Sequence, residues 1–178
     1  MRRTNYGLYP NPEIDANNWH QVKGLTSADS NFRGYTVHIT EWQHNNPEEH
    51  YWFQTTVRVY KHGTLCAEFN RNYPTFVGII ATQNNTDYLI TSANYQCITI
   101  CNLSTGEVKS YTDLDDVKHG FGFCPIEFDW DEEENTLIVE GCLWGFPVER
   151  MICEGIDLEN PIRAFNNAQW VDEEFDEE

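Results

Sequence analysis

The chain lacks a long hydrophobic run. Its longest uninterrupted apolar stretch, residues 76–81, is far shorter than the roughly 20 residues that a membrane-spanning helix needs. Residues 1–6 also contain no hydrophobic stretch of the signal-peptide type. We therefore expect no membrane association and no secretion, and hence a cytoplasmic protein.

Basic residues are scarce as well. Lys and Arg total 11 against 29 Asp and Glu, which gives a formal net charge of -18 at pH 7. Nucleic acids and anionic membranes attract positively charged proteins, and they repel negatively charged ones. The charge balance argues against nucleic acid or a membrane as a partner and favours a basic protein.

Motifs for catalysis and metal binding are missing. No Gly-x-Ser-x-Gly elbow occurs, and the six cysteines (66, 97, 101, 124, 142 and 153) include no Cys-x-x-Cys pair. Cys97 and Cys101 would lie about 13 Å apart on one strand, whereas a disulfide spans roughly 4.4 to 6.8 Å between Cα atoms. We expect reduced thiols, no metal site, no cofactor and no enzymatic activity.

What is present is enough apolar material for one domain. The 178 residues are 40% hydrophobic and 14% aromatic, which argues against a disordered chain. Little periodicity is visible in residues 1–30, so we predict an irregular N-terminal arm there. The prediction continues with a single all-β domain over 31–170 and an acidic disordered tail over 171–178.

Period-two segments recur along the predicted domain. They are rich in β-branched and aromatic residues, and Gly, Asn and Pro separate them. No window shows helical periodicity of useful length. The sequence therefore predicts antiparallel meanders of short strands. The predicted strands are 35–42, 51–60, 64–69, 76–82, 88–92, 96–101, 107–111, 126–130, 136–140, 148–153 and 162–165.

Two of these strand groups can be superimposed as a repeat. Residues 78–81 precede 87–91 in the same way that 126–129 precede 135–139, and Leu89 and Leu137 are 48 residues apart. Residues 87–107, with Asp87-Tyr88-Leu89-Ile90-Thr91 and Leu103-Ser104-Thr105-Gly106, resemble the inner strands of a WD40-type β-propeller blade. Where that family commonly has Trp-Asp, this chain has Cys101-Asn102, and the opening Gly-His pair is absent.

The resemblance implies blade-like sheets of four antiparallel strands each. Three such units are too few to close a propeller ring, which holds about four to eight. The sequence leaves two arrangements open: an open stack of blades that forms a homodimer, or a two-sheet sandwich or barrel.

Acidic residues concentrate in the second part of the chain. Residues 1–101 contain 8 acidic and 7 basic residues, whereas residues 102–178 contain 21 acidic and 4 basic ones. We place two internal clusters in solvated loops and propose them as partner-binding residues, together with an aromatic loop at 141–147. The predicted partner-binding residues are Asp113, Asp115, Asp116, Asp129, Asp131, Glu132, Glu133, Glu134, Trp144 and Phe146.

The leading functional hypothesis is a non-enzymatic acidic protein that occludes a basic protein surface. Immunity proteins and inhibitors that mimic nucleic acid act in this way, and their targets include nucleases and other nucleic-acid-binding enzymes. One alternative is a propeller-like interaction scaffold whose acidity is incidental. Others are a hydrolase or sugar-active enzyme using Asp129, Asp131 or Glu140, and acidic loops that bind calcium.

Overall fold

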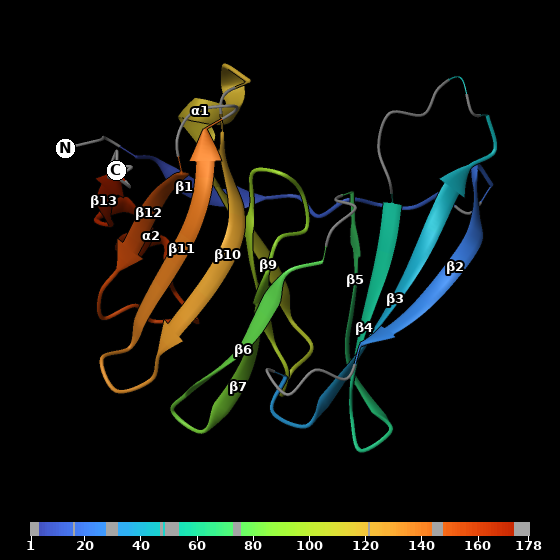
Figure 1. The fold of residues 1–178 in the computed structure, drawn as a ribbon, viewed down its shortest axis with the longest axis horizontal. Helices are drawn as coiled ribbons and strands as arrows, with labels where there is room; N and C mark the ends of the chain where they lie inside the picture. The colour runs from blue at the N-terminus through green and yellow to red at the C-terminus, as the bar shows by residue number, and fades with distance from the viewer. Residues whose placement is uncertain are drawn as a thin grey trace, which may run out of the picture.

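Three antiparallel sheets make up this computed structural model (Figure 1). It describes residues 4–15, 17–27, 32–46, 48, 54–72, 76–120, 122–143 and 148–172, with the backbone alone for 23–27 and 172. Strands account for 58% of the structure and helices for 8%. The prediction of an all-β fold of antiparallel meanders is confirmed, with three sheets instead of the two of a sandwich and without a closed barrel.

Each sheet contains a meander of four strands that are consecutive in the chain. The N-terminal sheet consists of β2 (Trp19–Ser27), β3 (Tyr35–His44), β4 (Gln54–Lys61) and β5 (Thr64–Arg71). The central sheet consists of β6 (Gly78–Gln83), β7 (Thr86–Thr91), β8 (Ile98–Asn102) and β9 (Val108–Asp113), and β1 (Tyr6–Tyr9) pairs with β9. The C-terminal sheet consists of β10 (Phe123–Asp131), β11 (Thr136–Leu143), β12 (Val148–Cys153) and β13 (Gln169–Asp172).

The central sheet lies between the other two, as Figure 1 shows. One face of it, with Leu89 and Cys101, packs against Val57 and Val59 of the N-terminal sheet. Its other face, with Tyr88, Ile90 and Ile100, packs against the C-terminal sheet. The buried residues of that second core in the C-terminal sheet are Phe128, Leu137, Val139, Met151 and Cys153.

Burial on both faces explains the composition of the central strands. Strand β8 is buried at all five positions, and β7 is buried from Tyr88 to Thr91. A strand in the middle of a stack has no solvated face, so its sequence is a continuous apolar or small polar run. In the outer sheets, by contrast, only one face is covered, and apolar and polar residues alternate.

Two of the predicted turns have the backbone of tight hairpins. Asn84 and Asn85 have φ values of 51° and 61°, and His62 and Gly63 have values of 51° and 80°. Positive φ at both central residues is the signature of the type I′ turn, which matches the twist of the strands that it joins. Asn and Gly tolerate this region better than other residues, so these positions identified the turns in the sequence.

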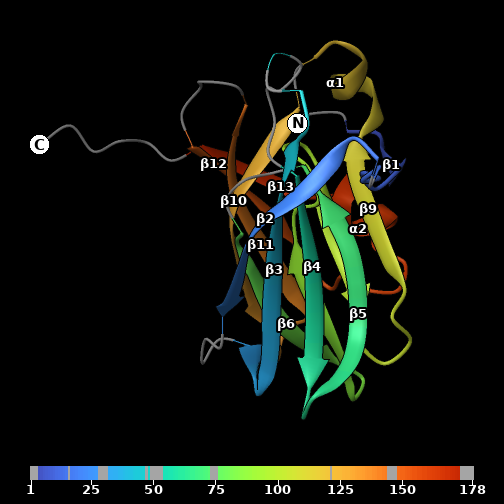
Figure 2. The same ribbon diagram turned by 90° about the vertical axis from the view of Figure 1, so that its right-hand side faces the viewer.

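Among the described residues, no other strand or helix lies in front of the outward face of the N-terminal sheet (Figure 2). Its polar side chains bond to one another across the strands. The Trp42 indole donates to Thr56 at 2.9 Å, Thr56 donates to Asn70 at 2.9 Å, and Arg58 is paired with Glu68.

The predictions for the two ends of the chain need correction. Residues 1–30, predicted as an irregular arm, contain β1 and β2. The partners of β1 lie more than 100 residues further along the chain, with Tyr6 opposite Asp113, so no local pattern could show the pairing. The first two residues of the predicted tail, 171 and 172, belong to β13 (Gln169–Asp172), and residues 173–178 lie outside the described residues.

The segment 162–165 is a helix and not a strand: α2 spans Ile162–Asn166. Four residues are too few to distinguish a period of 2 from one of 3.6. Pro161, with φ -77° and ψ -13°, already has helical backbone angles at the start of this turn. Phe165 of α2 is fully buried and packs against Tyr6 and Tyr111, with ring centroids 5.2 and 5.6 Å away.

A second short helix, α1 (Leu114–Lys118), follows β9. No helix in the described part of the chain is long and apolar enough to cross a membrane.

Candidate protein-binding face

The outward face of the C-terminal sheet is built from rows of residues that lie opposite one another on adjacent strands. One row is Glu127, Glu140, Arg150 and Val171, and the next is Asp129, Ile138, Ile152 and Gln169. A third row, Asp131 and Thr136, closes the β10–β11 hairpin. Since residues opposite each other share a face of the sheet, these rows form one surface.

A bulge in β10 sets which of its side chains point outward. The register shifts between Pro125 and Glu127, and Ile126 is the extra residue, 44% exposed. Strand β10 is at the edge of the sheet, where a proline and a bulge are tolerated because no outer neighbour needs the missing N–H. After the bulge, Glu127, Asp129 and Asp131 follow at every second position, so three exposed carboxylates lie along one edge of this face.

A groove of about 300 Å³ lies on this face. Its lining residues are Glu127, Phe128, Asp129, Ile138, Glu140 and Arg150. The Arg150 guanidinium donates twice to Glu140 Oε1, at 3.1 Å from Nε and 2.5 Å from a terminal nitrogen. Glu127 and Asp129 form no ion pair with any residue that the structure describes. The groove therefore presents two uncompensated negative charges beside the Ile138 side chain.

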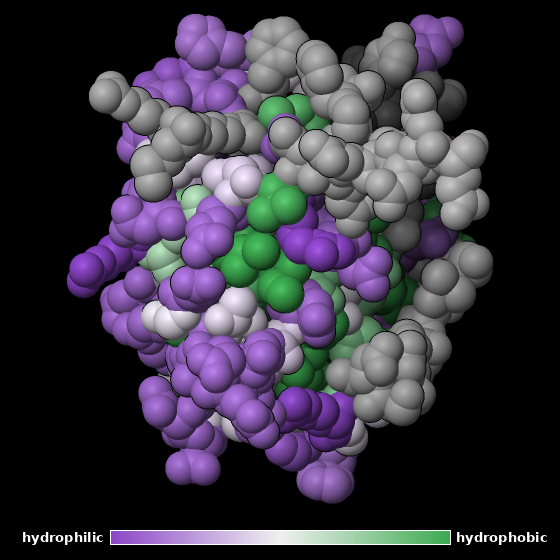
Figure 3. Space-filling model, turned by 60° about the vertical axis from the view of Figure 1, so that its left-hand side comes forward, coloured by the Kyte–Doolittle hydropathy of each residue, from purple (hydrophilic) through white to green (hydrophobic). Residues whose placement is uncertain are grey.

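Hydrophobic residues accompany the acids. Figure 3 shows a hydrophobic patch in the middle of this side of the molecule, with hydrophilic residues around it. On the outward rows, Ile138 and Ile152 are half-buried and Val171 is 45% exposed. An apolar centre with a charged rim is the usual anatomy of a protein-binding surface.

The acidic turn, residues 131–134, extends this face beyond the end of the sheet. It lies at the tip of the β10–β11 hairpin and is exposed at all four positions, so its predicted location is confirmed. Asp131 Oδ1 accepts the backbone N–H groups of Glu133 and Glu134 at 2.9 and 3.0 Å. One of the four carboxylates is thus used to shape the turn.

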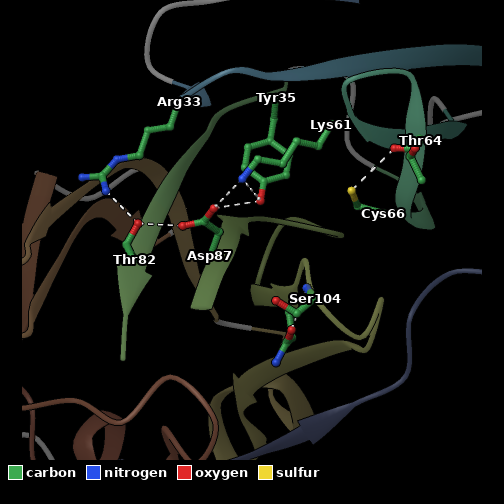
Figure 4. A network of polar contacts seen from close by, with 9 residues as sticks. Arg33, Tyr35, Lys61, Thr64, Cys66, Thr82, Asp87 and Ser104 are labelled. Atoms are coloured by element: carbon green, nitrogen blue, oxygen red, sulfur yellow. Dashed lines mark hydrogen bonds and ion pairs between the residues drawn. The ribbon is translucent and has the colours of Figure 1, made fainter. Parts of the chain in front are cut away.

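Arg33 attaches the acidic turn to the other two sheets. Its guanidinium forms an ion pair with Glu132 at 2.8 Å and donates to Thr82 Oγ1 at 2.7 Å. Thr82 in turn donates to Asp87 at 2.8 Å (Figure 4). This ion pair, between side chains that are 44% and 51% exposed, connects the turn to the rest of the stack.

Asp87 is the centre of that polar network. Besides Thr82, it accepts hydrogen bonds from the Tyr35 hydroxyl at 2.8 Å and the Lys61 ammonium at 3.2 Å (Figure 4). Burial by itself raises the pKa of the Asp87 carboxyl, but the bonds from Thr82, Tyr35 and Lys61 outweigh it and leave this pKa below its usual value. Asp87 is therefore ionised and links β3, β4, β6 and β7.

The other predicted acidic cluster is not a loop, which is a correction. Asp113 is 4% exposed and is the N-cap of α1: its carboxylate accepts the backbone N–H groups of Asp115 at 3.0 Å, Asp116 at 3.4 Å and Asn5 at 3.3 Å. Burial and capping leave Asp113 inaccessible to a partner.

Asp115 and Asp116 lie in the first turn of α1, where negative charge suits the helix dipole. A hydrogen bond from Lys118 at 3.1 Å, and another from Asn5, lower the pKa of the Asp115 carboxyl. Figure 1 places α1 at the upper ends of the strands and the β10–β11 turn at the lower ends, so the two clusters do not form one surface.

The remaining predicted residues, Trp144 and Phe146, lie outside the described residues. Within the described part of the chain, no group of three or more His, Cys, Asp or Glu is arranged to hold a metal ion.

Sequence reasoning missed Arg33, Glu127, Ile138 and Arg150. Glu127 and Ile138 are alternate residues of predicted strands, so a register assigned to the 126–140 hairpin would have placed both of them beside Asp129. Arg33 had no such signal, because its contacts are to segments about 50 and 100 residues away.

No protein-family model matches this chain, and no curated protein or solved structure matches it either.

Proposed function

We propose that this protein is a non-enzymatic acidic binding protein that occludes a basic surface of another protein. The binding surface in this proposal is the outward face of the C-terminal sheet together with the acidic turn. The observation that carries the proposal is the line of exposed carboxylates at Glu127, Asp129 and Asp131 beside the apolar Ile138.

Charge and apolar area have different effects on binding. Opposite potentials on two proteins speed their encounter, and desolvated apolar contacts in the middle of an interface slow their separation. Glu127 and Asp129 supply the first effect, because no described cation neutralises them. Ile138 and Ile152 supply the second.

The partner class follows from this chemistry: a protein with clustered Lys and Arg, such as a nuclease or another nucleic-acid-binding enzyme. Carboxylates spaced along a strand edge would take the place of phosphates on such a protein. No disulfide joins any two of the six cysteines in the structure, which fits a cytoplasmic protein, and we include this location in the proposal.

The test compares two variants of equal net charge. E127Q/D129N removes the uncompensated carboxylates of the groove, and E13Q/E48Q removes two exposed acids elsewhere in the sequence. Immobilised wild type and E13Q/E48Q should retain the same basic protein from an extract of the native host and release it as salt rises. E127Q/D129N should retain much less of it.

Equal retention by both variants would refute the proposed surface. A second measurement covers another role for the acids, since charges on an edge strand also prevent strands of different molecules from pairing. If E127Q/D129N only self-associates, as seen in its sedimentation, and still binds the partner normally, the charges protect the edge and do not bind.

One observation favours a second candidate, a propeller-like interaction scaffold. Each sheet contains a meander of four consecutive strands, the strand order of a propeller blade, and the three sheets stack face against face. In this alternative a second copy continues the open stack and forms a homodimer. Partner binding that is insensitive to salt, by a dimer, would support the scaffold over the acidic inhibitor.

A further inference from the structure

The outward face of the C-terminal sheet also carries two cysteines in one row. Cys124 on β10 and Cys142 on β11 are directly opposite partners in the antiparallel register. Such partners share a face of the sheet, and their Cα atoms are about 4.5 to 5.5 Å apart. A disulfide spans roughly 4.4 to 6.8 Å between Cα atoms, so a bond between these two thiols needs no change of register.

Neighbouring residues fix the two strands at this point. Gly141 has no Cβ, and a Cβ there would overlap both the Cys124 carbonyl oxygen and the Phe123 ring. The Phe123 ring packs edge-on against Trp170, with centroids 5.0 Å apart. The close approach of β10 and β11 at the cysteine row is therefore built into the packing of the opposite face.

The two thiols differ in accessibility. Cys142 is half-buried, whereas Cys124 is 9% exposed, and its sulfur donates to the Gly122 carbonyl at 3.5 Å. An oxidant in solution therefore meets Cys142 first. Elsewhere in the chain, burial raises the pKa of Cys97, Cys101 and Cys153 to about 12, which keeps these three as unreactive thiols near neutral pH.

We propose that Cys124 and Cys142 are an oxidative modification site that closes to a cross-strand disulfide by exchange with a low-molecular-weight disulfide such as glutathione disulfide. The Cys142 thiolate attacks one sulfur of glutathione disulfide and releases one glutathione, which takes up a proton. The Cys124 thiol loses its proton to solvent, attacks the Cys142 sulfur and releases the second glutathione. Two protein thiols are oxidised to one disulfide, and one glutathione disulfide is reduced to two glutathiones.

This site is independent of the proposed function, since it rests only on register and packing. It ties β10 to β11 near the end of the hairpin opposite the acidic turn. The bond closes a loop from residue 124 to residue 142, which restricts the unfolded chain and raises the melting temperature.

The experiment uses the full chain, reduced, desalted without oxygen and incubated with glutathione disulfide near pH 8. The number of thiols after denaturation should fall from six to four. The intact mass should fall by two hydrogens, and peptide mapping should find the Cys124–Cys142 link. The melting temperature of the oxidised protein should be higher than that of the reduced protein.

Two variants define the order of events. C124S should stop at a stable glutathione adduct on Cys142, because no second thiol can resolve it. The control C153S, changed on the inner face of the same sheet, should still lose two thiols. Three results with the wild type would each overturn the proposal, whatever the variants do. The protein could keep six thiols, it could stop at a stable glutathione adduct on Cys142, or its disulfide could map to any other pair.

Discussion

The substitution Asp87→Asn tests whether the Asp87 carboxylate holds strands β3, β4, β6 and β7 together. Asparagine has the same shape as aspartate but no charge, and its amide nitrogen cannot accept hydrogen bonds. In the wild type, one Asp87 oxygen accepts from Thr82 at 2.8 Å and the other accepts from Tyr35 at 2.8 Å and Lys61 at 3.2 Å. The variant side chain would keep only one good acceptor for these donors.

The expected loss follows from the number of bonds and the exposure of the group. A hydrogen bond to a charged group contributes about 1.5 to 3 kcal/mol to stability. The Asp87 side chain is 23% exposed, so solvent weakens the bonds only in part. We expect D87N to lower the free energy of unfolding by about 2 to 4 kcal/mol, which corresponds to roughly 4 to 15 °C in melting temperature for a chain of this length.

The effect should depend on pH with a defined sign. Because the pKa of Asp87 is lower in the folded protein than in the unfolded chain, its ionisation stabilises the fold above the unfolded value of about 4. That stabilisation disappears as the pH falls through the lower, folded pKa. The difference in stability between wild type and D87N should therefore be largest near neutral pH and shrink below about pH 4.

Urea unfolding of both proteins between pH 3 and 7 measures this difference. E154Q is the control, because Glu154 is an exposed acid that forms no ion pair with a described residue, and it should unfold like the wild type. D87N as stable as the wild type at pH 7, or a loss that does not change between pH 3 and 7, would refute the role of the ionised carboxylate.

Three further predictions address the core, the acidic turn and the buried tyrosines. Phe165→Ala should lower the free energy of unfolding by about 3 to 5 kcal/mol in urea, since the ring is fully buried; a loss under about 1 kcal/mol would contradict its place in the core. E133Q/E134Q spares the ion pair between Arg33 and Glu132. It should leave the melting temperature equal or higher and slow association with a basic partner about tenfold at low salt. Unchanged association would make the turn a solubility feature. Burial raises the pKa of Tyr111 to about 12 and that of Tyr88 further, so an absorbance titration at pH 11 should leave at least these two of the nine tyrosines un-ionised. Stability should fall above about pH 10 because the unfolded chain ionises first; full ionisation with the fold intact would contradict this.

Hairpins were the part of the fold that could be predicted. Asn84-Asn85 and His62-Gly63 join strands that are neighbours in the chain, so turn chemistry and alternation within about 15 residues contain the needed information. The partner of β1 is far away in sequence, and the helical turn at 162–166 is stabilised by Phe165 packing under Tyr6. Both depend on tertiary contacts that override weak local preferences.

For the candidate face, composition located the acids but not their arrangement. The two acidic clusters have similar spacing, yet Asp113 faces inward as a helix cap while Asp131 shapes an exposed turn. An N-cap and a turn both favour Asp, so its presence cannot distinguish them. The grouping of Glu127 with Glu140 follows from the regular register of the hairpin, whereas the bulge that reverses the outward side beyond Glu127 is revealed by no spacing in the sequence.

The two outer sheets explain why binding is assigned to only one end of the stack. The central sheet is covered on both faces, so in the part of the chain that the structure describes only the N-terminal and C-terminal sheets have an uncovered face. On the N-terminal sheet, Arg58 is neutralised by Glu68, and the polar atoms of Trp42 and Thr56 already have partners. Binding through these groups would require breaking these bonds. On the C-terminal sheet, Glu127 and Asp129 have no described ion-pair partner, so a Lys or Arg from another protein gains a contact without displacing one. The asymmetry of charge along the chain thus becomes an asymmetry between the two ends of the molecule, and it predicts that partner binding and its salt dependence follow substitutions on β10, not those on β3 or β4.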